Sequence, residues 1–323
     1  MHSMKRVEEL KQCETGVLPS GIVDYALTSS VYNLCFWILK DKSIVFLPGA
    51  NTTVAIIHHN GRFEVYSSEC NTRYTAIVKM VLGVENDYTG FYDLALRDPL
   101  LRDFATMYRG WRLRQSDLWW SLVTGICQQN ASFKQGWSML HKIVLNYGRH
   151  VSLDNLVVPR PPKPIEVLEK PEVLLESGVG YRAKTILNTA RAIVSGLIDE
   201  LENTSGVCEA ERSLKRIDGI GPYTARLAIV LSMNNYTLPP VDRWLKKIIS
   251  VVYSVDEKYA EEFWVSKWGE WSGLASIATT IALDAEPLSR ALERIRRGEL
   301  LPNPSVNPSP VNMSGFCSLL MAR

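Results

Sequence analysis

A carboxylate and a two-glycine turn lie near one another in the second half of the chain. Gly219 and Gly221 interrupt a helical pattern, and Asp242 follows a pair of prolines at 239 and 240. Glycines let a backbone approach another surface, and the free N–H groups that begin the next helix bind anions such as phosphate. An ionised carboxylate can stabilise positive charge that develops as a neighbouring bond breaks. These residues therefore predict a site that grips a DNA backbone and breaks a bond beside it.

Three helices must position these groups. Residues 208–216 are predicted to be helical, the glycine turn ends that helix, and Pro222 begins the next, which runs to 232. Asp242 stands where an N-cap belongs, ahead of a helix over 243–253. An ordinary helix–turn–helix corner and a plain N-cap aspartate explain each feature when it stands alone.

The combination resembles the helix-hairpin-helix Gly-Pro-Asp superfamily of DNA glycosylases, nearest its 8-oxoguanine and 3-methyladenine II branches. The resemblance covers roughly residues 90–290. It implies that Asp242 drives cleavage of the N-glycosidic bond. It also implies that the hairpin binds the DNA backbone through Gly219, Ile220, Gly221 and Thr224.

Two further segments are similar to this family in the same order along the chain. Residues 113–132 resemble its helix-and-loop entry segment, in which Asn130 matches an asparagine that fills the gap left by a flipped base. Residues 178–187 resemble a segment in which a tyrosine wedges into the duplex and an arginine contacts the opposite base. Tyr181 and Arg182 match those two residues.

One departure from the family concerns the reaction. Members that also cleave the strand carry a lysine two residues after the second hairpin glycine, where this chain has Tyr223. Without that amine no Schiff base forms, so we expect simple hydrolysis without AP lyase activity. The alternatives are an 8-oxoguanine glycosylase/AP lyase with its lysine elsewhere, and a hairpin DNA-binding protein without catalysis.

The cofactor expectations follow from the same resemblance. An iron–sulfur cluster of the family type needs four clustered cysteines, and only Cys317 follows Asp242, so no cluster is expected. No His/Cys set has zinc spacing. The resemblance also implies an alkali cation at the hairpin carbonyls, although no side-chain signature shows it.

The base pocket is predicted from matched positions, which do not reproduce the 8-oxoguanine branch. Leu227 stands where that branch has cysteine, and Ser276 and Thr280 fall near its glutamine and phenylalanine. Tyr223, Leu227 and Trp271 are the expected pocket residues. Alkylated purines stack well on electron-rich rings, so an alkylated purine is the expected substrate. Trp119 and Trp120 are instead expected in the core.

Composition gives weaker indications. The net charge of +2 is nearly neutral and does not indicate a nucleic-acid partner, so any DNA-binding surface must be a local cluster of positive charge. The six cysteines show no pairing pattern, which favours free thiols in a reducing compartment. No apolar run is long enough to span a membrane and no secretory leader is evident. We expect an intracellular monomer that binds duplex DNA containing a damaged base. Three basic sets could contact DNA: Arg109, Arg112 and Arg114; Arg182 and Lys184; and Arg243, Lys246 and Lys247.

The expected fold is α+β, with a mainly helical bundle and a small antiparallel sheet. Residues 1–92 are expected to form the sheet domain, 93–297 the helical domain, and 298–323 a proline-rich extended or disordered tail. Strands are predicted over 31–39, 43–47, 53–59 and 62–66, with a hairpin at Asn60–Gly61. Helices are predicted from Ser116 as N-cap to 128, and over 133–147, 181–201, 256–268, 272–283 and 289–297.

Overall fold

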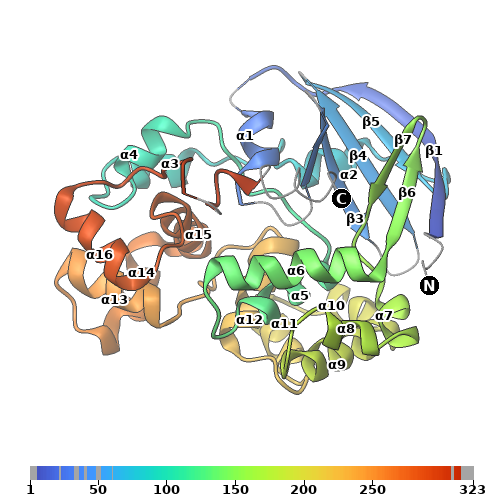
Figure 1. Ribbon diagram of the computed structural model, residues 1–323. Helices are drawn as coiled ribbons and strands as arrows, with labels where there is room; N and C mark the ends of the chain where they lie inside the picture. Colours follow the sequence, from blue (N-terminus) through green and yellow to red (C-terminus); the bar gives the residue numbers. More distant parts are fainter. Residues whose placement is uncertain are drawn as a thin grey trace.

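The computed structural model describes residues 6–21, 23–32, 36–39, 42–48, 52–59, 61–306 and 309–313. Two layers make up the described chain: a sheet on one side and a bundle of helices on the other (Figure 1). The predicted α+β class is confirmed. Whether 1–92 and 93–297 act as separate domains stays a prediction.

The sheet of the described chain has seven strands in the order β2-β3-β4-β5-β1-β6-β7. Alternate residues of its central strands point to opposite faces. Ile44 and Ile57 pack into the large core shared with the helices. Val45 and Ile56 pack on the other face, under the helix α2. The strands are β1 (Arg6–Val17), β2 (Phe36–Leu39), β3 (Lys42–Pro48), β4 (Thr53–His59), β5 (Arg62–Ser67), β6 (Arg149–Leu153) and β7 (Leu156–Pro159).

The strand predictions succeed where the pairing is local. Strands β4 and β5 form an antiparallel hairpin in which His59 pairs with Arg62. Asn60 in its turn lies outside the described residues. The predicted strand over 31–39 is corrected at its start, because 31 and 32 are bends and only 36–39 is described as strand.

Three strands were not predicted, and one of them changes the sheet. β1 pairs antiparallel with β5 but parallel with β6, which comes from the middle of the chain. The sheet is therefore mixed rather than purely antiparallel, and it draws β6 and β7 from residues expected in the helical part. No local pattern signals such a pairing, because the partners are far apart in sequence.

Most helices of the bundle begin and end near the predicted residues. α6, α12 and α13 agree at both ends, while α5 is capped by Asp117, which accepts from the Trp120 N–H at 2.9 Å, and not by Ser116. No helix in the described part of the chain is both long and apolar enough to cross a bilayer. The helices are α1 (Tyr25–Ser30), α2 (Thr75–Val81), α3 (Thr89–Ala95), α4 (Arg102–Met107), α5 (Leu118–Gln128), α6 (Phe133–Tyr147), α7 (Pro164–Glu169), α8 (Glu172–Glu176), α9 (Arg182–Val194), α10 (Leu197–Glu202), α11 (Val207–Leu214), α12 (Pro222–Ser232), α13 (Arg243–Tyr253), α14 (Ala260–Trp268), α15 (Ser272–Ala282) and α16 (Leu288–Arg297).

Some polar expectations are wrong because the residues are buried. Arg112 and Arg114 are 4% and 2% exposed, so this pair forms no DNA-binding surface with Arg109. The Arg112 guanidinium instead stacks on the Tyr88 ring, 4.5 Å from its centroid. Trp119 and Trp120 are buried in the core, as expected.

The expectation that all six cysteines are free is also wrong. Cys13 in β1 and Cys70 after β5 form a disulfide. Cys127 is free and buried, and Cys208 is free and exposed. A sequence separation of 57 between the bonded pair leaves no local spacing from which the bond could be read.

The segment after α16 departs from the predicted tail. Met313 is fully buried and belongs to the main core, and Ser309 is also fully buried. The described part of this segment is therefore packed against the molecule, although its sequence is rich in proline and poor in apolar residues.

Candidate active site

A cavity of about 210 Å³ lies where α5, α6, α12, α13 and α15 approach one another. Asp242 and Tyr223 both line it, so the carboxylate and the helix that follows the glycine turn meet at one site. The described lining residues are Gln128, Ala131, Ser132, Phe133, Tyr223, Pro240, Asp242, Trp244, Leu245, Thr280, Ala285, Glu286 and Pro287.

Asp242 is the N-cap of α13, as predicted. Its Oδ1 accepts a hydrogen bond from the Leu245 N–H at 2.8 Å. Its side chain is open to the cavity. Burial by surrounding protein raises the pKa of Asp242, while the N–H groups that begin α13 oppose that shift. The helix N-terminus therefore favours the ionised form, as expected, but burial is the larger influence.

The glycine turn has the geometry that requires glycine at its first position. Gly219 has φ of +93°, and a Cβ there would collide with the Thr185 side chain. Gly221 is extended at φ −95° and Pro222 begins α12 directly after it. Gly219 is exposed and a Cβ at Gly221 would meet open space, so the backbone of this turn is accessible to a ligand. Ile220 is buried and anchors the turn.

The Thr224 hydroxyl, expected at the DNA backbone, is instead buried. Gln129 Nε2 donates to Thr224 Oγ1 at 2.8 Å and to the Gly219 carbonyl at 3.0 Å. Gln129 thus ties the loop after α5 to the glycine turn. Sequence reasoning missed this residue, although it stands directly before Asn130.

The residues expected to enter the duplex and to contact the opposite base are brought together. Asn130 has φ of +47° and its Nδ2 lies 3.5 Å from the Tyr181 hydroxyl. Tyr181 is 64% exposed, and the Arg182 guanidinium lies 4.6 Å from its ring centroid. Arg182 also donates to the Gln129 carbonyl. Asn130 and Tyr181 are exposed and Arg182 is half-buried, and we call these three residues the wedge.

The expected base-pocket residues are only partly assembled. Tyr223 lines the cavity, but Leu227 is fully buried in the core and Trp271 packs against Tyr88 and Tyr236, with ring centroids 5.6 and 6.1 Å away. Neither Leu227 nor Trp271 is among the described residues that line the cavity. Phe133 and Trp244 supply the other aromatic walls, and neither was predicted.

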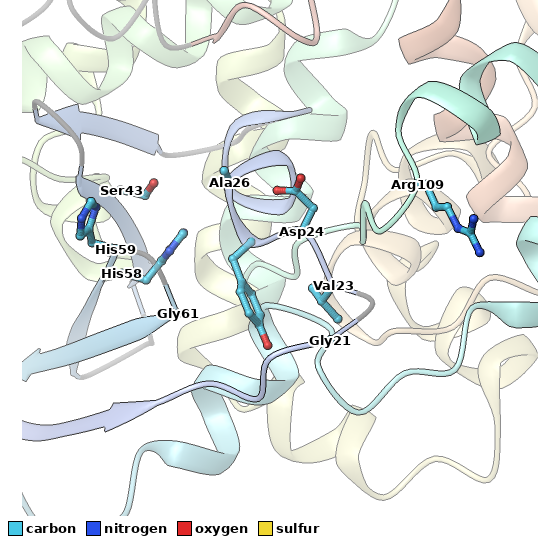
Figure 2. A pocket seen from close by; sticks show the side chains of 10 residues that line it. Gly21, Val23, Asp24, Ala26, Ser43, His58, His59, Gly61 and Arg109 are labelled. Atoms are coloured by element: carbon cyan, nitrogen blue, oxygen red, sulfur yellow. The ribbon is translucent and has the colours of Figure 1, made fainter.

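A larger cavity of about 630 Å³ lies between α1 and β4 (Figure 2). Three of its polar residues have hydrogen-bond partners within the protein. Asp24 caps α1 by accepting from the Leu27 N–H, Tyr25 donates to the Pro19 carbonyl, and His58 shares a hydrogen bond with Ser29. Burial lowers the pKa of His58 to about 4, so its ring is neutral at physiological pH. This cavity shares no lining residue with the Asp242 cavity.

The hairpin carbonyls are the groups that would hold the implied alkali cation. The Ile217 carbonyl accepts from the Ile220 N–H, and the Gly219 carbonyl accepts from Gln129. Each carbonyl oxygen keeps one lone pair, which is the donor type that such a cation prefers. The cation stays a proposal, as does the absence of an iron–sulfur cluster, because Cys317 lies outside the described residues.

Comparisons of the sequence give distant relatives with glycosylase names. No family model matches the chain. It is 26% identical over 202 residues to a DNA-3-methyladenine glycosylase of Bacillus subtilis, across 60% of this chain and 66% of that protein. It is 23% identical over 161 residues to an N-glycosylase/DNA lyase of Saccharomyces cerevisiae, across 46% of this chain and 43% of that protein. The alignments therefore span about half to two thirds of these relatives.

Solved structures share the fold over most of the chain. A 3-methyladenine DNA glycosylase from Archaeoglobus fulgidus superposes with a TM-score of 0.68 at 19% identity, covering 82% of this chain and 96% of that one. An 8-oxoguanine glycosylase/lyase of Clostridium acetobutylicum gives 0.66 at 19% identity, covering 84% and 98%. The predicted resemblance to DNA glycosylases is confirmed by the names of these relatives and by the shared fold.

Proposed function

We propose that this protein is a DNA glycosylase that flips a damaged base out of duplex DNA and hydrolyses its N-glycosidic bond. The observation that carries the proposal is the meeting of Asp242 and Tyr223 in one cavity directly beside the glycine turn. Duplex DNA with a damaged base is then the partner, and the protein works where the cell keeps its DNA.

Extrusion of the base comes first. A stacked and paired base shields its glycosidic bond, and flipping it costs a few kcal/mol. The backbone N–H groups around Gly221 hold a phosphate, while the wedge occupies the vacated space and presses on the opposite base. Gln129 joins these two parts, because it bonds both the glycine turn and Arg182. The glycine turn and the wedge are therefore expected to act on the strand together.

Bond cleavage follows in the cavity. As the base leaves, positive charge develops on the deoxyribose, and the ionised Asp242 stabilises that charge and orients an attacking water. Asp242 is exposed on the cavity wall, and a nucleotide bound there would displace the surrounding water, which makes such an interaction stronger than in bulk water.

The products follow from the residues that face the sugar. Tyr223 lines the cavity at the position of the lyase lysine, and no lysine is among the described lining residues. Burial raises the pKa of the Tyr223 hydroxyl well above its usual value, so it stays protonated and is a poor nucleophile. We infer that the protein leaves an intact abasic site.

The lesion is inferred from the cavity walls. Phe133, Tyr223 and Trp244 offer ring surfaces, and Asp242 adds a negative charge. Alkylation at a purine ring nitrogen makes the base electron-poor or cationic, and such a base is attracted to both features. We therefore propose an alkylated purine as the substrate.

The test is incubation with a panel of duplexes that each contain one lesion. We expect release of 3-methyladenine or 7-methylguanine and little release of 8-oxoguanine. Strand cuts should appear only after alkali. Release of 8-oxoguanine alone, together with borohydride trapping of a protein–DNA adduct, would support the glycosylase/lyase alternative instead. Binding without release of any base would leave the hairpin-binding alternative.

A further inference from the structure

The segment after α16 contacts two walls of the cavity that are far apart in sequence. Ser309 Oγ donates to Asp284 Oδ1, and the Asn303 N–H donates to Asp284 Oδ2 at 2.7 Å. The Pro310 carbonyl accepts from the Tyr32 N–H at 2.8 Å. We call residues 303–306 and 309–313 the strap.

The first wall is a turn that needs support from outside itself. Asp284 and Ala285 have φ of +54° and +50°, a region that side chains other than glycine rarely adopt. Such conformations persist when the surroundings over-determine them. Asp284 is held by the strap and by Arg294 Nη1 at 2.8 Å, and its side chain is fully buried. Ala285 and the two residues after it line the cavity.

The second wall is supported from behind by Tyr32. This residue also has a positive φ, of +51°, and is buried. Its ring centroid lies 6.4 Å from that of Phe133, and its side chain hydrogen-bonds Gln128. Phe133 and Gln128 both line the cavity. The strap therefore fixes the backbone of the residue against which this wall packs.

The strap is itself anchored to the body of the protein. Met313 is fully buried, Asn312 Nδ2 donates to the Pro304 carbonyl at 2.9 Å, and the Val311 N–H donates to Ser309 Oγ at 3.2 Å. These contacts hold the strap's two ends together, so it can transmit a fixed geometry to both walls.

We propose that the strap positions the 284–287 turn and Tyr32 so that the cavity holds the flipped base in line with Asp242, and that Ser309 is a positioning residue for base release. This inference rests on the proposed glycosylase activity. The wedge and the glycine turn lie outside the strap's contacts, so duplex binding should not depend on it.

Ser309→Ala tests the proposal, with Ser305→Ala as its matched control, because Ser305 is exposed in the same segment. We expect the single-turnover rate of base release to fall about fivefold in Ser309→Ala, because the variant loses the hydrogen bond to Asp284. It also loses the bond that Ser309 Oγ accepts from the Val311 N–H within the strap. The Kd for a duplex carrying an abasic-site analogue should change by less than about twofold. Ser305→Ala should change neither. An equal loss of rate and of abasic-site affinity would overturn the proposal, as would a wild-type rate.

Two measurements guard against a trivial loss of folding. Adding Ala285→Gly to Ser309→Ala should recover part of the rate, because glycine adopts this φ without strain. If Ser309→Ala does not fold, Asn312→Ala replaces it as the test, because Asn312 is a half-exposed strap residue. This variant should lower the rate of base release by a smaller factor. A folded strap variant with neither a lowered rate of base release nor a recovery of rate by Ala285→Gly would contradict the proposal.

A further measurement does not depend on activity. The Ala285 N–H bonds the Thr280 carbonyl and the Glu286 N–H bonds the Leu283 carbonyl. In Ser309→Ala these two amides should exchange with solvent faster than in the wild-type protein, while amides of α12 should not. Unchanged exchange of these two amides would contradict the proposal that the strap positions the 284–287 turn. Wild-type protein that exchanges as expected but releases no base would instead reject the proposed function alone.

Discussion

The grip and the cavity's far wall are built in different ways. The grip consists of the glycine turn, Pro222 and the N-cap Asp242, which lie close together in sequence and belong to consecutive helices. The far wall joins Tyr32, the 284–287 turn and the strap, which come from both ends of the chain. Turn and capping interactions close in sequence account for much of the first region, whereas the second also depends on contacts between segments that are distant in sequence. The residues proposed to bind the backbone and cleave the bond are thus close together in sequence, whereas the residues that shape the cavity for the base are far apart.

Asp242→Asn separates binding of the DNA backbone from the chemical step, and it has the largest expected effect. Asparagine caps helices as well as aspartate does, so folding and duplex binding should persist. Loss of the charge beside the sugar should slow base release on the order of 10³-fold, as removal of one electrostatic group from other active sites does. Single-turnover kinetics and a thermal melt on the same preparation measure both. A slowing of less than about tenfold would remove Asp242 from its role.

A large effect on the scaffold, with little on the site, is expected from the disulfide. Reducing the bond between Cys13 and Cys70 frees a loop with a sequence separation of 57. The chain-entropy model gives a loss of about 4 kcal/mol in the free energy of unfolding. Denaturant titrations with and without reductant measure this loss. Well below the melting temperature, the oxidised and the reduced protein should release the base at the same rate, since neither cysteine lines the cavity. A fall in rate on reduction would show that the sheet affects the active site.

The glycine turn offers a smaller and more local perturbation. Gly219→Ala introduces a Cβ that collides with Thr185 at a positive φ, at a cost of roughly 1–3 kcal/mol. Gly221→Ala meets open space and should destabilise the fold less. Titrations of duplex binding and of stability compare the two. Equal destabilisation by both substitutions would show that the turn does not have the described geometry.

The pH profile is the mildest test, because it changes no residue. Burial raises the pKa of Asp242, and the reaction needs the ionised form. Base release should therefore fall as the pH drops through a value above that of an ordinary aspartate, 3.8. Rates measured across this range, with circular dichroism to confirm folding, locate the midpoint. A midpoint at or below the ordinary value would contradict the described burial.

The same contrast explains what could be predicted from the sequence. The helix bounds around Gly221 and Asp242 follow from proline at N1 and an N-capping carboxylate, and they agree with the structure. The parallel pairing of β1 with β6, the disulfide and the packing of Met313 involve residues distant in sequence, which leave no local pattern. Trp271 was expected in the pocket because aromatic residues suit a base, yet side-chain type alone does not show which face of the fold a residue occupies.

The most direct test of the central claim uses one duplex carrying a single 7-methylguanine. The wild-type protein in excess is allowed to react, and the sample is divided into halves with and without hot alkali. Hydrolysis driven by Asp242, with Tyr223 in place of an amine, predicts strand cleavage in the alkali-treated half only, and more of it than the same alkali produces in a protein-free sample. It also predicts no covalent adduct when borohydride is present. Cleavage without alkali, or a trapped adduct, would contradict this account.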